Sequence, residues 1–293
     1  MLSYKHTFVG LFIAIQLFVL STTVHSQIVE NKPDSVKGKT SSLANKPWPV
    51  SRFSVRLGGF WAINTTDIGA GLNGKKNASF DVENVFNMDR NTYSGMLNFN
   101  VRLGKHNRID FSYYNIYRSS TATLKKDIQF GDHEYPVNSS IGAHLNTNVF
   151  RLSYGYSFYS NPKVEVGALI GFHMMAFNTG VKLNGNTIER SYKDDVNFMA
   201  PLPDVGVWGT YAFAKRWAVS MELSYFYLKY KSLSGRILNA QLQAQYKISE
   251  HWQIDLGYTN FDVWVGLDRK HLKADFDWNY NGPFLTGIYK FGR

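Results

Sequence analysis

The 293-residue sequence contains no cysteine. That absence excludes disulfide scaffolds, thiolate zinc sites, catalytic thiols and the acylated cysteine of a lipoprotein. Charged residues are also scarce, at 18% of the chain, whereas aromatic residues reach 16%. This composition excludes a disordered chain, which would be more highly charged and poorer in aromatic residues. Frequent Tyr and Phe suit β-strands and membrane interfaces better than they suit a soluble helical enzyme.

Only one long hydrophobic run is present, and it lies near the N-terminus. A short basic segment precedes the apolar run from Phe8 to Leu20, and the residues before Gln27 offer a cleavage site. This order is that of a secretory signal peptide. The alternative of a retained anchor is disfavoured because the run falls short of the roughly 20 residues of a spanning helix. We therefore expect a signal peptide at 1–26 and an exported mature chain without a spanning helix.

The segment after the expected cleavage site has a different composition. Residues 27–50 are rich in Pro, Ser and Lys and show no periodicity. Such a composition is typical of a flexible linker, here expected to lie in the periplasm. Residues 51–293 read as one further domain.

That domain alternates hydrophobic and polar residues with a period of two. Between Tyr93 and Leu103, and again between Arg236 and Ile248, every second residue is apolar or small while the others are mostly polar. A period of two predicts strands, because successive side chains of a strand point to opposite faces. About ten alternating residues also match a tilted strand that crosses a bilayer. Ten such segments are expected, near 51–63, 92–104, 107–119, 147–159, 162–177, 201–213, 216–230, 235–248, 251–264 and 281–292.

The connections between these segments alternate in length. Short turns are expected at 104–107, 160–162, 214–216 and 249–251, with polar loops at 64–91, 120–146, 178–200, 231–234 and 265–280 between them. Aromatic residues gather beside both sets of connections, among them Trp217 and Trp252 near the short turns and Trp61 and Tyr258 near the long loops. Short turns at one end, long loops at the other and two aromatic girdles are typical of outer-membrane barrels. Both termini then lie on the periplasmic, short-turn side.

The sequence thus predicts an all-β fold, a transmembrane antiparallel up-and-down β-barrel of about ten strands at 51–293. Eight or twelve strands are alternatives, because 64–91 and 120–146 could hold extra pairing. A secreted β-sandwich is the competing architecture, and it would bury Phe99, Leu152 and Leu242 between its sheets.

Several stretches carry a family resemblance over most of the mature chain. They are HNRIDFSYY at 106–114, IQFGD at 128–132, LSYGYSF at 152–158, APLP at 200–203 and GPFL at 282–285. In these the chain resembles the small outer-membrane β-barrel proteins of Gram-negative bacteria, and is most similar to a group of uncharacterised barrels among them. The resemblance implies a location in the outer membrane and a barrel architecture, but no known activity. It also implies that the closing strand, with Phe291 two residues from the end, is read by the barrel-assembly machinery.

The strand face opposite the apolar one is expected to line the lumen. Its charged residues are Arg56, Arg102, Asp110, Arg118, Arg151, Glu165, His173, Asp204, Glu222, Lys247, Asp255 and Lys290. Charges held away from bulk water are retained only with partners, so a charge-paired network is expected. In particular, Arg56, Arg102 and Arg151 should pair with some of the carboxylates. A cation facing the bilayer midplane would instead cost about 2–4 kcal/mol.

The net charge of +10 has a local explanation. Basic residues collect at the short turns, including Lys105, Arg108, Lys163, Lys215 and Arg216, and this side would face anionic headgroups or periplasmic partners. We expect no nucleic-acid partner, because no basic stripe coincides with a stacking platform. The expected partners are outer-membrane lipids and lipopolysaccharide.

Three kinds of function remain open. The first is a non-enzymatic outer-membrane barrel, either a structural membrane component or a narrow porin-like channel with a polar lumen. The alternatives are a lipid- or peptide-directed hydrolase, with His173 and Glu165 or with Asp132 and His133 or His144, and a surface recognition protein acting through its long loops. We expect no enzyme, cofactor or metal, because no nucleophile motif and no metal-ligand spacing occurs among the eight histidines.

Overall fold

The structure is a computed structural model, and it describes residues 51–72, 78–124, 127–130, 133–135, 137–184, 193–269 and 272–292. The expected signal peptide at 1–26 and linker at 27–50 lie outside these residues. Among the residues described, no helix is long and apolar enough to cross a membrane.

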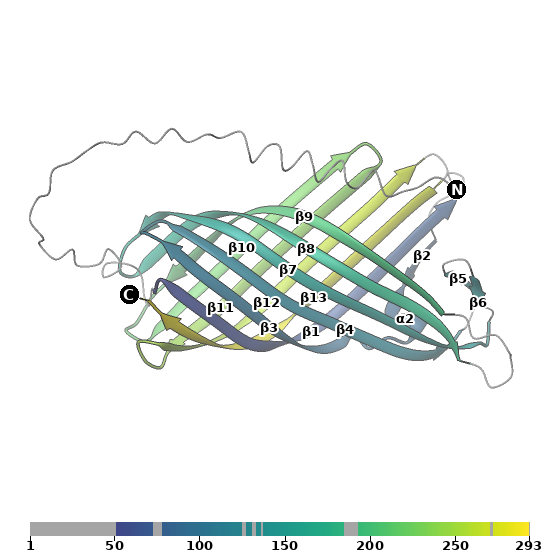
Figure 1. Ribbon diagram of the computed structural model, residues 1–293, viewed down its shortest axis with the longest axis horizontal. Coiled ribbons are helices and arrows are strands. Elements are labelled where there is room, and N and C mark those ends of the chain that lie inside the picture. The colour runs from purple at the N-terminus through teal and green to yellow at the C-terminus, as the bar shows by residue number, and fades with distance from the viewer. Residues whose placement is uncertain are drawn as a thin grey trace, which may run out of the picture. The chain divides into compact units, whose positions relative to one another are not determined.

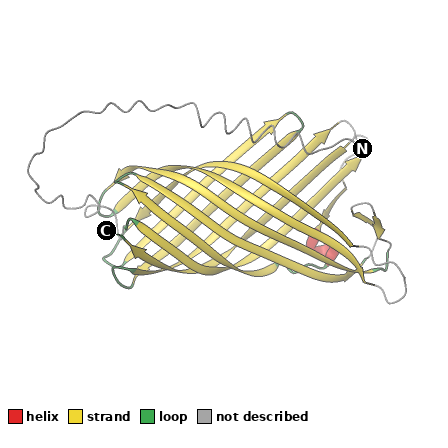
Figure 2. Ribbon diagram, in the orientation of Figure 1, coloured by secondary structure: helices red, strands yellow, loops and turns green. Residues whose placement is uncertain are grey.

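Ten antiparallel strands form a closed ring (Figures 1 and 2). Each strand pairs with the next along the ring, and the last pairs with the first from Phe53 opposite Phe291 to Leu72 opposite Leu272. The ring strands are β1 (Phe53–Leu72), β3 (Asn91–Leu103), β4 (Asn107–Thr123), β7 (Ser140–Ser160), β8 (Val164–Asn184), β9 (Lys193–Tyr211), β10 (Trp217–Tyr230), β11 (Leu233–Lys247), β12 (Trp252–Arg269) and β13 (Leu272–Phe291). The prediction of an antiparallel barrel with ten strands is confirmed.

Smaller elements lie between the ring strands at the long-loop end. Strand β2 (Ala78–Asp81) pairs with β1, and β5 (Ile128–Phe130) pairs with β6 (His133–Tyr135) in a separate two-stranded sheet. The five-residue helix α2 (Val82–Phe86) is capped by Asp81, whose side chain accepts a hydrogen bond from the Asn84 backbone amide at 2.9 Å. That bond satisfies one of the otherwise unpaired amides of the first turn.

The long connections contain more strand than the sequence suggested. Strand β8 continues to Asn184 and β9 begins at Lys193, within the expected loop 178–200. Likewise β12 reaches Arg269 and β13 begins at Leu272, so the expected loop 265–280 is almost entirely strand. Backbone pairing needs no apolar side chains, and therefore continues past the point where the hydrophobic alternation ends.

The outer face of the ring is apolar. Large aliphatic side chains on six strands are 55–60% exposed, namely Leu57, Leu152, Ile170, Leu242, Leu256 and Leu285. The predicted girdle residues Trp217, Trp252, Trp61 and Tyr258 are exposed as well. Because Leu152 and Leu242 face outward rather than into a core, the β-sandwich alternative is wrong. A continuous apolar outer wall is the surface that a barrel presents to lipid.

The inner face changes character along the barrel. In the short-turn half it is polar and charged, as the alternation indicated. In the long-loop half it is largely apolar, because many inward positions there hold residues such as Ile116, Val149, Met175, Ile237 and Val263, each at most 1% exposed. Strand parity alone assigned apolar residues to the lipid face and so did not predict this filling.

An aromatic layer forms the boundary between the two halves. It consists of Phe60, Tyr114, Phe177, Phe261, Trp278 and Tyr280, all at most 9% exposed. Phe177 on β8 lies 6.0 Å from Trp278 on β13, which joins opposite walls of the ring. The layer therefore crosses the lumen.

Candidate functional site

A polar cavity of about 240 Å³ occupies the short-turn half of the lumen. Its lining extends from Ser51 and Lys290, near the chain ends of the barrel, to Tyr114 and Tyr280 of the aromatic layer. Polar side chains from nearly every ring strand face it, because period-two alternation points one side chain in two inward. This cavity is the candidate functional site.

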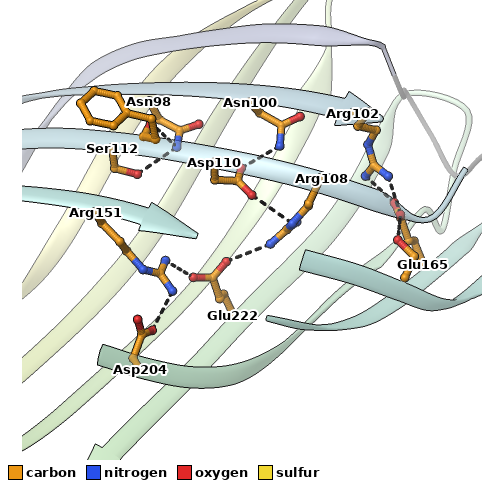
Figure 3. Close-up of polar contacts among 12 residues, drawn as sticks. Asn98, Asn100, Arg102, Arg108, Asp110, Ser112, Arg151, Glu165, Asp204 and Glu222 are labelled. Carbon is orange, nitrogen blue, oxygen red and sulfur yellow. Dashed lines mark hydrogen bonds and ion pairs between the residues drawn. The ribbon is translucent and has the colours of Figure 1, made fainter. Parts of the chain in front are cut away.

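One ion pair on its wall joins Arg102 of β3 to Glu165 of β8 (Figure 3). The two terminal guanidinium nitrogens of Arg102 each lie 2.6 Å from a different carboxylate oxygen of Glu165. The Ser157 hydroxyl also donates to Glu165, whose side chain is 2% exposed. Two parallel charge-assisted bonds fix both position and orientation.

A longer chain of charges runs along the neighbouring wall (Figure 3). Arg151 contacts Asp204 at 2.9 Å and also donates to Glu222. Glu222 in turn accepts from Arg108 at 3.2 Å, and Arg108 lies 3.1 Å from Asp110. Two arginines and three carboxylates on four strands are thus linked, which leaves each charge with an opposite partner.

A third group lies nearer the short-turn end. Arg56 contacts Asp255 at 3.0 Å and donates to the Gln243 side chain at 3.1 Å. Gln253 donates to the same carboxylate and accepts from the Lys290 ammonium at 2.6 Å. Asp255 is fully buried, so these contacts replace its lost hydration.

Trp208 packs against two of these arginines, Arg102 and Arg108. The Arg108 guanidinium carbon lies 3.7 Å from the centre of the Trp208 ring, a cation–π geometry. The indole packs against the wall at Gly167, where a Cβ atom would come within 2.7 Å of the ring. Glycine at this inward position of β8 therefore makes the room that the tryptophan needs.

Two residues expected in the network lie apart from it. Arg118 pairs with Glu83 of α2 and donates to the Thr66 hydroxyl at 2.6 Å, in the long-loop half. Lys247 pairs with Glu250 at 2.5 Å beside the short turn. His173, also expected inside, lies 3.4 Å from Asp204 and is 2% exposed.

Two charged residues that form ion pairs in the lumen, Arg108 and Glu83, were not among the predicted lumen residues. Arg108 was assigned to the basic short turns, although it shares the inward parity of Asp110 two residues later. That alternation was the available signal. Glu83 lies on α2 within the expected loop 64–91, where no periodicity indicated its direction.

The proposed catalytic histidine pairs are not brought together among the residues described. Glu165, the expected partner of His173, is bound to Arg102 instead. The His144 imidazole contacts the Asn178 side-chain oxygen at 3.0 Å, and Asp132 and the His133 side chain lie outside the description. No group of three or more His, Asp or Glu in the described part of the chain could hold a metal ion.

Comparison with known proteins identifies the fold. No protein-family model and no curated protein matches the sequence. Among solved structures, the outer membrane protease OmpT from Escherichia coli is similar with a TM-score of 0.50 at 11% identity, covering 81% of this chain and 97% of that chain. At this identity the similarity concerns the fold, which is that of an outer-membrane β-barrel.

Two further solved structures are matched over most of their length. The translocator domain of the autotransporter NalP from Neisseria meningitidis has 11% identity and a TM-score of 0.40, covering 82% of this chain and 87% of that chain. The outer membrane protein OprG from Pseudomonas aeruginosa has 12% identity and a TM-score of 0.34, covering 83% and 98%.

Proposed function

We propose that this protein is a non-enzymatic barrel of the bacterial outer membrane, and that its lumen is closed to solutes. It would then serve as a structural component of the membrane rather than as an open channel. The observation that carries this proposal is the aromatic layer across the lumen.

The layer is tightly packed. The Tyr280 ring lies 5.2 Å from Phe261, 5.3 Å from Trp278 and 5.6 Å from Phe60 between ring centres. The Tyr280 hydroxyl donates to the Tyr114 hydroxyl at 2.6 Å, which satisfies both groups beside the cavity. Aromatic rings at these separations attract one another and exclude water, so the layer favours a lumen that does not conduct.

The charged network supports the same function. Opening a path along the cavity would separate ion pairs such as Arg151 with Asp204, whose carboxylate is fully buried. Breaking such a pair leaves an uncompensated charge, a change that costs several kcal/mol, about 3–5 in measured cases. A network of this kind favours a rigid filling over a channel lining that rearranges.

Conductance across planar lipid bilayers tests the proposal. We expect purified wild-type barrel to give no steady current, and the variant Tyr114→Ala/Tyr280→Ala to conduct, because two rings of the layer are then missing. The matched control Tyr225→Ala/Tyr258→Ala removes two outward rings and should remain silent. Heat-modifiable migration in gels verifies that each variant is folded. Steady current through the wild type would reject the closed lumen in favour of the narrow channel.

The outer surface and the last strand of the barrel indicate which partners it contacts in the membrane. We propose that the apolar outer wall contacts outer-membrane lipids and lipopolysaccharide, and that β13 is recognised by the barrel-assembly machinery. The hydrolase alternative would require turnover of lipid or peptide by the purified wild type that is lost in His173→Ala or His144→Ala. A surface-recognition role would instead be supported by a ligand that binds the long-loop end.

A further inference from the structure

The wall of the cavity formed by β11 and β12 carries hydrogen-bonded residues such as Gln243, and beside them three uncharged polar side chains without a partner among the residues described. Asn239, Gln241 and Thr259 line the cavity, and their side chains form no hydrogen bond with any other residue that the structure describes. Gln241 and Thr259 lie directly opposite each other in the β11–β12 register. Thr259 is only 8% exposed, whereas Asn239 and Gln241 are partly buried.

A polar side chain that faces a cavity without a protein partner leaves its hydrogen-bonding groups to water or to a ligand. The neighbouring Gln243 shows the contrast: its side chain accepts from Arg56 and donates to Ser220 at 2.9 Å. A ligand or ordered water is therefore the natural partner of Asn239, Gln241 and Thr259.

The charge around the cavity restricts the ligand. Five cations are present and five carboxylates oppose them: Arg56, Arg102, Arg108, Arg151 and Lys290 against Asp110, Glu165, Asp204, Glu222 and Asp255. An anionic or cationic ligand would have to break one of these pairs to find its own counter-charge. An uncharged ligand would not.

The unpartnered groups lie beneath the aromatic layer. Phe261 and Tyr280 stack with ring centres 5.2 Å apart and planes 18° apart, and Asn239 is opposite Phe261 in the register. The inner end of the cavity thus offers amide and hydroxyl groups beside apolar rings. Hydroxyl groups of a ligand can both donate and accept, which suits an amide, while its C–H groups can contact the rings.

We propose that this inner end of the cavity binds a small, uncharged, polyhydroxylated molecule, such as a monosaccharide or another polyol. The volume of about 240 Å³ corresponds to about eight water molecules at about 30 Å³ each. It lies below the range of about 300–1,000 Å³ for pockets that hold drug-sized ligands, so the ligand is small. Because the lining reaches Ser51 and Lys290, the ligand enters from the short-turn end and stops at the aromatic layer.

Saturation-transfer NMR measures ligand binding to the full barrel and so tests the site. The barrel is held in a zwitterionic detergent without a sugar headgroup, so that the detergent cannot compete with a sugar probe. Glucose is the uncharged probe, and gluconate and glucosamine are its anionic and cationic counterparts. We expect glucose to bind with higher affinity than either charged analogue. We expect Gln241→Ala and Thr259→Val each to weaken glucose binding roughly fivefold, which corresponds to one lost hydrogen bond.

Asn260→Ala provides the matched control, because Asn260 follows Thr259 on β12 and points to the outer face. It should leave glucose binding unchanged. Absence of a glucose signal with the wild type would mean that the cavity holds water only, and would overturn the proposal. So would an equal loss in Asn260→Ala, or tighter binding of either charged analogue. None of these outcomes depends on conductance, so the closed-lumen proposal is tested separately.

Discussion

Arg151 shows how much a single residue contributes to the interior of this barrel. It bonds to carboxylates on two other strands, Asp204 on β9 and Glu222 on β10, and its side chain is 12% exposed. We expect Arg151→Ala to lower the thermal unfolding temperature of the barrel in detergent, by the equivalent of about 3–5 kcal/mol for a broken buried pair. Unfolding followed by intrinsic fluorescence or gel mobility measures the change.

The matched control for Arg151 is Arg90→Ala. Arg90 also forms an ion pair, with Asp81 at 2.8 Å, but its side chain is 45% exposed. Exposed pairs contribute about 0–1 kcal/mol, so this variant should unfold close to the wild-type temperature. Equal shifts for both variants would show that the Arg151 pairs are as well hydrated as surface ones.

At the residue scale, the alternation of the sequence was sufficient to place Arg56, Arg102 and Arg151 on one face. Which carboxylate each arginine meets depends on strand register and on the shear of the ring, and neither is encoded in a single strand. The unpartnered Gln241 and Thr259 illustrate the same limit. Parity points both inward, but only the assembled ring shows that no residue in its described part hydrogen-bonds to their side chains.

At the scale of elements, β7 and β8 are shaped around Trp208. A Cβ atom at position 167 would lie 2.6 Å from the Tyr156 carbonyl oxygen and 2.7 Å from the indole. We expect Gly167→Ala to destabilise the barrel by about 1–3 kcal/mol, the usual range for overpacking, because neither the backbone nor the rigid ring can move aside freely. Chemical denaturation of the reconstituted barrel gives the change in free energy.

Gly209→Ala is the control for this element. A Cβ atom there would meet its nearest neighbours at 3.7 and 3.9 Å, an ordinary contact distance. The substitution should therefore change the free energy of unfolding little. If both alanine variants unfold alike, close packing against Trp208 is not what requires glycine at 167.

At the scale of the whole molecule, the number and positions of the ring strands could be predicted from the sequence more completely than the contacts of single residues. All ten expected segments coincide with ring strands, because alternation, turn length and girdles agree over the same residues. The strand extensions beyond the apolar band and the aromatic layer were not predictable in this way. Inward residues such as Phe60 and Trp278 are apolar like their lipid-facing neighbours elsewhere, so hydrophobicity alone cannot tell the two sides of the wall apart.

The orientation of the whole barrel can be tested because the chain has no cysteine of its own. We expect Asp268→Cys, at the long-loop end, to react with a membrane-impermeant maleimide on intact cells. Lys105→Cys, in a short turn, should react only after the outer membrane is permeabilised, because both ends of the ring then become accessible. The wild type serves as the unlabelled control. Labelling of the Lys105→Cys variant alone on intact cells would mean that the orientation is reversed.

The pairing of β1 with β13 also determines the order in which the molecule can form. The first ring strand pairs early with β3 but has to wait for the last strand, so one of its two partners is absent for almost the whole of synthesis and export. Until then the sheet has two unpaired edges, each of which can template pairing with another chain. Contacts between such distant segments are slow to form, because a long loop must close first. A chain cut before Leu272 would keep both edges permanently, which makes it a substrate for aggregation or proteolysis rather than a smaller barrel.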